Sequence, residues 1–203
     1  MAIDPGVSGG VAVAAMNAVT CHAMPDTEGD RLELIRSFKT AAEIEGASCV
    51  CVLEEVSGFV GKAQPGSAMF KFGEHYGFIK GVVQALGIKL VLVRPQVWQK
   101  SFGLGTASRC ASQSDWKNKL KAEAQRRFPA VVVTLKTSDA LLILEWAQAA
   151  QANGTDRKFS DAVQRVPPNE DFGKASGVSP EVARGTRALP GEQKQTKQQS
   201  KTP

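Results

Sequence analysis

The pattern of apolar and polar positions predicts a few short strands, followed by helices and strands in alternation. Val- and Ala-rich runs at 1–3, 9–16 and 18–24 are punctuated by glycine and asparagine, which indicates an antiparallel start. Apolar residues at helical spacing follow over 30–45, and Gly46 stands where a helix ends. The next segment, SCVCVLEEV, reads as an apolar strand that closes on Glu54 and Glu55.

The second part of the chain predicts four helices and one further strand. A glycine-rich loop over 57–67 leads into a helix over 69–86, and a fully apolar strand spans 88–93. Helices are expected over 95–101, 115–127 and 138–152. This order predicts an α/β fold with a mixed central β-sheet and flanking helices. Gly73, Gly77 and Gly81 recur every four residues, so another helix or a second copy of the chain could approach one face of that helix closely.

The character of the sequence changes near residue 153. We expect one folded domain over residues 1–152 and a polar, low-complexity, disordered C-terminal tail over 153–203, which ends in GEQKQTKQQSKTP. The formal net charge of the chain is +5. Residues 154–203 hold nine Lys and Arg against six Asp and Glu, so the domain itself is only mildly basic. This balance allows a nucleic-acid partner but does not require one.

Composition excludes several classes of protein. No apolar run approaches the roughly 20 residues of a membrane-spanning helix, and no secretory signal is visible. The four cysteines form no Cys-x-x-Cys pair, which favours reduced thiols over a zinc site or disulfides. Only three residues precede Asp4, so we expect either a short first strand or a natural start upstream of Met1.

Three acids lie beside apolar residues in different parts of the chain. Asp4 ends the first strand, Glu54 ends the strand CVCVLE, and Asp139 begins the last helix in SDALLILEW. Each has an ordinary explanation alone: a turn former, a strand end in solvent, or a charge at a helix N-terminus. If all three meet at one end of the sheet, they need a cation, and carboxylate oxygens suit Mg²⁺ or Mn²⁺. The sequence therefore predicts metal-dependent phosphodiester cleavage.

The order of several segments resembles the RuvC-like Holliday junction resolvases. These segments are IDPGVSGGVAV, VLEEV, SAMFKFGEHYGFIKGVVQALGIKLVLVRPQVWQKSFGL, KNKLKAEAQRRFP and SDALLILEW, and they cover residues 1 to about 148. The likeness is to the phage and bacterial branch and to the plant plastid branch, typified by monokaryotic chloroplast. It implies a ribonuclease-H-like fold, a homodimer, and Mg²⁺-dependent cutting of four-way DNA junctions by paired symmetrical nicks, with Mn²⁺ as a substitute. It also favours a chloroplast location, or the cytoplasm for a bacterial or phage protein.

The resemblance assigns roles to individual residues. Asp4, Glu54 and Asp139 match the metal-binding acids of the family, and Lys117 matches a lysine that the family places near the scissile phosphate. The alternative for Lys117 is a water-facing position like that of its neighbours Lys119 and Lys121.

The same resemblance suggests DNA contacts. In the 57–67 loop, Phe59 could wedge against an unstacked base at the junction centre and Lys62 could meet a phosphate, as could Lys119 on the helix. The alternative for Phe59 is a loop anchor that packs on the core. Trp98 reads as a core residue.

Two departures from the family pattern keep other functions open. The usual fourth ligand is replaced by Lys136 or Leu135, and neither side chain suits a metal, so a second ion is weakly held, held by Glu55 or Asp115, or absent. Gln99 stands where relatives often carry lysine. The missing fourth ligand favours the alternative of a junction-binding protein that lacks efficient cleavage, whereas the presence of Asp4, Glu54 and Asp139 together argues against it. A third possibility, an actin-like ATP-binding protein, needs a second glycine-rich phosphate turn, and the sequence has none.

Overall fold

The computed structural model describes residues 1–16, 18–56 and 66–153, which all belong to one compact unit. The sheet is made of β1 (Ala2–Asp4), β2 (Gly10–Ala15), β3 (Ala18–Ala23), β4 (Val50–Glu54) and β5 (Lys89–Val93). The helices are α1 (Glu28–Ile44), α2 (Gly66–Ala85), α3 (Pro95–Lys100), α4 (Gln113–Arg127) and α5 (Ser138–Asn153), with a 3₁₀ turn over Ala107–Arg109. Residues 66 and 67, expected in a loop, belong to α2.

The five strands form one mixed sheet in the order β3-β2-β1-β4-β5. β1, β2 and β3 pair antiparallel, whereas β4 lies parallel to both β1 and β5. Three antiparallel strands followed by parallel strands reached through helical crossovers make the ribonuclease-H-like arrangement, so the predicted fold class is confirmed. β1 is three residues long.

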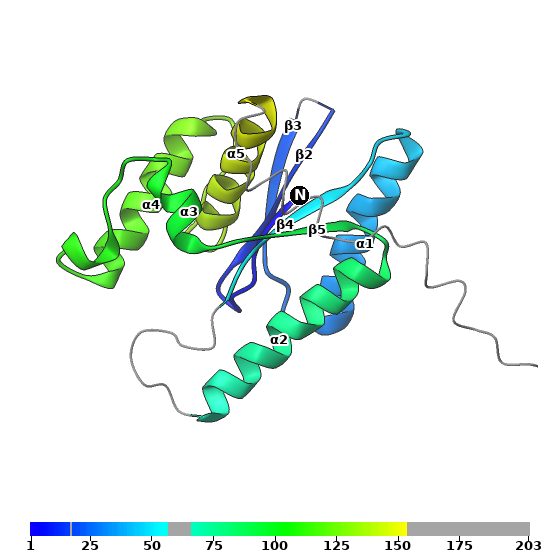
Figure 1. Cartoon of the computed structure of the whole chain (residues 1–203), viewed down its shortest axis with the longest axis horizontal. Helices are drawn as coiled ribbons and strands as arrows, with labels where there is room; N and C mark the ends of the chain where they lie inside the picture. Colours follow the sequence, from blue (N-terminus) through cyan, green and yellow to red (C-terminus); the bar gives the residue numbers. More distant parts are fainter. Residues whose placement is uncertain (17, 57–65, 154–203) are drawn as a thin grey trace, which may run out of the picture. The chain divides into compact units, whose positions relative to one another are not determined.

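Helices cover both faces of the sheet (Figure 1). α1 and α2 lie on one face, and α3, α4 and α5 lie on the other. The strands alternate between the two cores: Ala2 and Val52 pack toward α3–α5, whereas Ile3 and Leu53 pack toward α1 and α2. On the face covered by α3, α4 and α5, it is α5 that packs against the central strands β1, β2 and β4. None of the helices in the described ranges is long and apolar enough to cross a membrane.

Two segments that carry predictions lie outside the described residues. One is the 57–65 segment with Phe59 and Lys62, and the other is the tail from residue 154 onward. The roles given to them stay predictions.

Candidate active site

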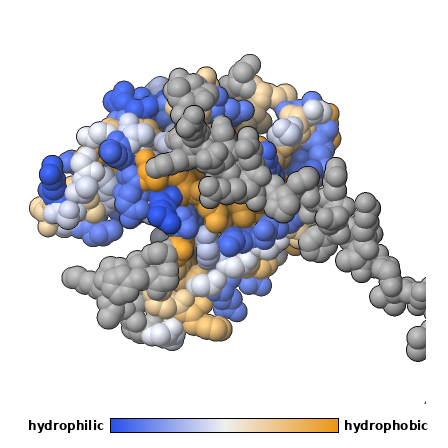
Figure 2. Space-filling model, viewed as in Figure 1, coloured by the Kyte–Doolittle hydropathy of each residue, from blue (hydrophilic) through white to orange (hydrophobic). Residues whose placement is uncertain are grey.

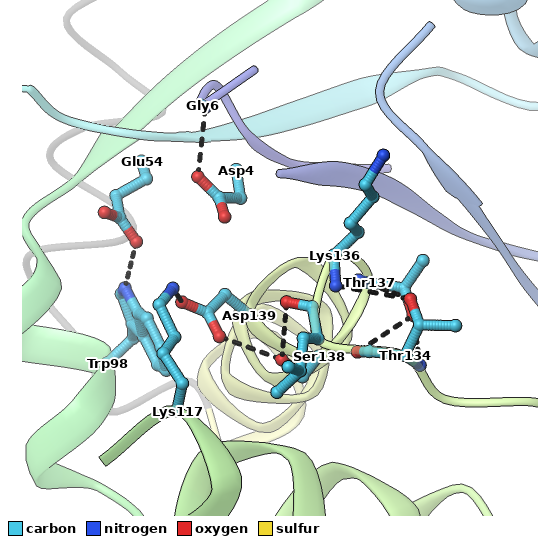
Figure 3. A network of polar contacts seen from close by, with 11 residues as sticks. Asp4, Gly6, Glu54, Trp98, Lys117, Thr134, Lys136, Thr137, Ser138 and Asp139 are labelled. Carbon is cyan, nitrogen blue, oxygen red and sulfur yellow. Dashed lines mark hydrogen bonds and ion pairs between the residues drawn. The ribbon is translucent and has the colours of Figure 1, made fainter. Parts of the chain in front are cut away.

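Asp4 is held at the end of β1 by the turn that follows it. The turn closes with a hydrogen bond of 2.8 Å from the Gly9 amide to the Gly6 carbonyl. The Gly6 amide donates to Asp4 Oδ1 at 3.2 Å, so the turn folds back onto the carboxylate (Figure 3). Aspartate before a glycine-rich turn is favoured here because its side chain accepts from a main-chain amide two residues on.

Glu54 lies beside Asp4 because their strands are parallel neighbours. Ile3 is the register partner of Leu53, so the two acids come next on adjacent strands. The period-2 alternation that sends Ala2 and Val52 toward α5 sends Asp4 and Glu54 to the same side. Glu55 follows with the opposite phase, and its carboxylate pairs with Arg94 at 3.1 Å.

The indole of Trp98 is the hydrogen-bond partner of Glu54. Its Nε1–H donates to Glu54 Oε2 at 3.0 Å. Trp98 is fully buried on α3, and its ring meets the ring of Phe102 edge-on. The sequence interpretation of Trp98 as a core residue is therefore right about its burial but missed its polar contact with a candidate metal ligand.

Asp139 reaches the same place from the first turn of α5. Its side chain is buried, and it accepts hydrogen bonds from Lys117 Nζ at 2.6 Å and from the Ser138 hydroxyl at 3.1 Å. Lys117 comes from α4, where Trp116, Leu120 and Ala124 form the buried stripe. Lys117 lies at the edge of this stripe, whereas Lys119 is exposed. The structure thus brings Asp4, Glu54, Asp139 and Lys117 together and leaves Lys119 on the helix surface.

When all three acids are ionised, they carry more negative charge than their surroundings balance. Burial raises the pKa of Glu54 to about 8, and the charges of Asp4 and Asp139 add to this effect. Burial and the charge of Asp139 raise the pKa of Asp4 to about 6. Burial acts to lower the pKa of Lys117, but its pairing with Asp139 and the charges of Asp4 and Glu54 raise it overall. One ammonium therefore partly neutralises three carboxyl groups.

A divalent cation fits the chemistry of this cluster. Carboxylate oxygens are the ligands that Mg²⁺ and Mn²⁺ prefer, and the excess negative charge matches such an ion. Within the described ranges, no three His, Cys, Asp or Glu side chains lie close enough together, as they stand, to hold a metal ion. Asp4, Glu54 and Asp139 are the residues that would hold the ion. Lys136 and Leu135, at the place of the family's fourth ligand, are both exposed.

Sequence comparison and structural comparison gave different results. No family model matches the chain, and no curated protein matches it. Solved structures that are similar include Thermus thermophilus RuvC, and T. thermophilus RuvC in complex with Holliday junction substrate. Each is 14% identical with a TM-score of 0.45, and the alignments cover 75% of this chain and 95% and 94% of the two RuvC chains.

Proposed function

We propose that this chain is a structure-selective endonuclease that cuts four-way (Holliday) DNA junctions by paired symmetrical nicks. The observation that carries the proposal is the meeting of Asp4, Glu54 and Asp139, from three separate elements, at one end of the sheet. The ordered resemblance of five sequence segments to RuvC-like resolvases supplies the substrate class. The same resemblance supports a role in DNA recombination and repair, and a plastid location.

Each side chain of the site has a separate task in the proposed reaction. Asp4, Glu54 and Asp139 hold Mg²⁺, for which Mn²⁺ can substitute. When bound, such an ion polarises the scissile phosphate and activates water. The Lys117 ammonium donates to Asp139, and its remaining N–H groups would serve a phosphate oxygen. Trp98 fixes the orientation of the Glu54 carboxylate through its N–H.

Further residues are proposed for DNA contact and for assembly. Phe59, Lys62 and Lys119 would contact the junction, and the lysines of the tail would add salt-sensitive affinity. A homodimer is proposed through α2, where Cβ atoms added at Gly73, Gly77 and Gly81 would meet nothing within 4 Å. Phe70 on the same helix is 73% exposed, and the start of α2 has apolar surface in Figure 2. A twofold dimer would place two sites on a junction of matching symmetry.

The proposal is tested with a labelled mobile four-way junction and a linear duplex of the same sequence. We expect nicks in two opposed strands of the junction with Mg²⁺ or Mn²⁺, none in EDTA, and little cutting of the duplex. Tight junction binding without nicks in either metal would favour the junction-binding alternative, which the exposed Lys136 and Leu135 support. Equal cutting of the duplex would contradict junction selectivity.

Replacing Lys117 separates its role from that of an ordinary surface lysine. Lys117→Met is expected to lower the single-turnover cleavage rate by roughly 10²-fold, because one preorganised donor to the phosphate is lost. Its effect on junction affinity should be small. The matched variant Lys121→Met, on the same helix, should cleave at the wild-type rate. Equal rates for both variants would show that Lys117 takes no part in cleavage.

A further inference from the structure

Gly9 packs directly against Asp4. A Cβ built on Gly9 would lie 2.4 Å from the Asp4 carbonyl oxygen, 2.7 Å from Cγ and 2.9 Å from Oδ1. These distances are shorter than real Cβ contacts, so no larger residue fits while Asp4 stays in place. Neither Gly9 nor Gly10 is among the described glycines with positive φ, so close approach and not backbone freedom explains both.

Gly10 packs against the turn that begins α5. A Cβ there would lie 2.6 Å from the His22 carbonyl oxygen, 2.8 Å from the Lys136 carbonyl oxygen and 3.4 Å from Thr137 Cα. β2 therefore touches main-chain atoms that are more than a hundred residues away in the sequence. Two of these atoms belong to residues that immediately precede the first turn of α5.

Hydrogen bonds within this turn hold its shape, so a displacement of the turn also displaces the start of α5. The Thr134 amide donates to Thr137 Oγ1 at 3.0 Å, and the Thr137 amide donates to Thr134 Oγ1 at 3.2 Å. The Ser138 amide donates to the Thr134 carbonyl at 3.0 Å, which ties the first residue of α5 to the turn. Asp139 comes next. An unbroken series of contacts thus runs from Asp4 through Gly9 and Gly10 to Asp139.

We infer that the Gly9–Gly10 pair is a spacer that sets the distance between Asp4 and Asp139, and that both glycines are positioning residues for the metal. The inference rests on the proposed function. A side chain at position 9 would displace Asp4, and one at position 10 would press both on the β3 main chain at His22 and on the turn before α5, which shifts the start of α5 relative to the sheet. Mg²⁺ requires ligands at about 2.0–2.1 Å, whereas Ca²⁺ accepts about 2.3–2.6 Å in flexible geometry. Wider spacing therefore penalises Mg²⁺ more than Ca²⁺.

The experiment measures metal binding by the full chain without DNA. Free Mn²⁺ is counted by electron paramagnetic resonance, and Mg²⁺ and Ca²⁺ are added as competitors. For Gly10→Ala we expect Mg²⁺ affinity to fall about 10- to 100-fold, the range for losing support around a ligand. Ca²⁺ affinity should fall clearly less, so the ratio of Mg²⁺ affinity to Ca²⁺ affinity decreases. A purely structural role would lower both alike and leave the ratio unchanged.

Gly29→Ala is the matched control. Its Cβ would have Thr27 Oγ1 at 3.9 Å as its nearest neighbour, an ordinary contact, so both affinities should equal those of the wild type. An unchanged ratio in folded Gly10→Ala overturns the spacer. Failure of the wild type to bind Mn²⁺ instead contradicts the proposed metal site, which distinguishes the two failures.

Thr134→Val keeps the test decisive if Gly10→Ala does not fold. Thr134 is exposed, and this nearly isosteric change removes the hydroxyl that accepts from the Thr137 and Lys136 amides. The turn loosens without added bulk, so we expect a smaller shift of the ratio in the same direction. No shift in a folded Thr134→Val protein overturns the inference.

Discussion

Asp4→Asn is expected to lower the rate of junction cutting by roughly a thousandfold or more, with junction affinity unchanged or higher. The amide is nearly isosteric, so its Oδ1 still accepts the hydrogen bond from the Gly6 amide and the turn keeps its shape. The change removes one of three negative ligands from the proposed metal site, and losses of several kcal/mol in transition-state stabilisation are typical of such sites. Removing a negative charge close to a DNA phosphate also reduces repulsion, which is why affinity should not fall.

Single-turnover cleavage and binding must be measured separately to test this prediction. Cleavage is followed with enzyme in excess over a labelled junction in Mg²⁺, and binding by gel shift in EDTA. Asp26→Asn is the matched control, because Asp26 is an exposed aspartate in the loop before α1. It should cut at the wild-type rate. Comparable cutting by Asp4→Asn and wild type would remove Asp4 from the metal site.

The positions of Asp4 and Glu54 could be predicted because the ends of strands are recognisable in the sequence. A short apolar run that stops at an acid marks the edge of a sheet, and this rule predicted both Asp4 and Glu54 correctly as strand ends. Alternation then separates Glu54 from Glu55, since Val52 and Leu53 pack in different cores. The α/β class with a mixed sheet followed from the same signals, because antiparallel strands and then alternating helices and strands leave few topologies. The ribonuclease-H-like arrangement was expected only from the family resemblance.

The position of Lys117 could also have been predicted more firmly from helix phase. Trp116, Leu120 and Ala124 recur every four residues and mark the buried stripe of α4. Residues three or four apart lie on the same side of a helix, so Lys117, three residues before Leu120, lies at the edge of the buried stripe. Lys119 lies outside the stripe and is exposed.

Contacts between distant segments could not be predicted from local pattern. The Trp98 N–H reaches Glu54 only because α3 follows β5, the parallel neighbour of β4. A buried tryptophan looks the same in a sequence whether or not its nitrogen bonds a carboxylate. Gly9 and Gly10 likewise read as turn residues, because the contact of Gly10 with the Lys136 carbonyl depends on how α5 packs.

The second large effect is a loss of stability of the metal-free protein as the pH rises. The pKa of Asp4 is raised from 3.8 to about 6 and that of Glu54 from 4.5 to about 8. Between the unfolded and folded values, the folded protein keeps protons that the unfolded chain has released. The free energy of unfolding therefore falls as the pH rises from about 4 through 8. Only above pH 8 are both Asp4 and Glu54 ionised in the folded protein, so the full loss of stability is reached only there.

Other titrating groups narrow the interval in which this effect is measured. Burial lowers the pKa of His75, which makes stability rise with pH up to about 6.5 and opposes the acids there. The pKa of Glu123 is lowered to about 2 by its bonds to arginine, so its contribution changes only in more acidic solution. The pKa of Lys117 is raised, which keeps its titration above this range. The interval from pH 6.5 to 8 therefore isolates Glu54.

Thermal unfolding in EDTA at constant ionic strength should show this loss directly. A change of about 1.5 pH units at one group corresponds to roughly 2 kcal/mol, or about 4–8 °C in Tm for a chain of this size. Glu54→Gln should abolish most of the decline and unfold at a higher temperature than the wild type at pH 8. Glu74→Gln, an exposed change on α2, should decline as the wild type does. A flat wild-type profile from pH 6.5 to 8, or an equal slope in Glu54→Gln, would contradict the buried acid cluster. Added Mn²⁺ should raise the wild-type Tm more at pH 8 than at pH 6, because the acids must lose their protons before they bind the ion.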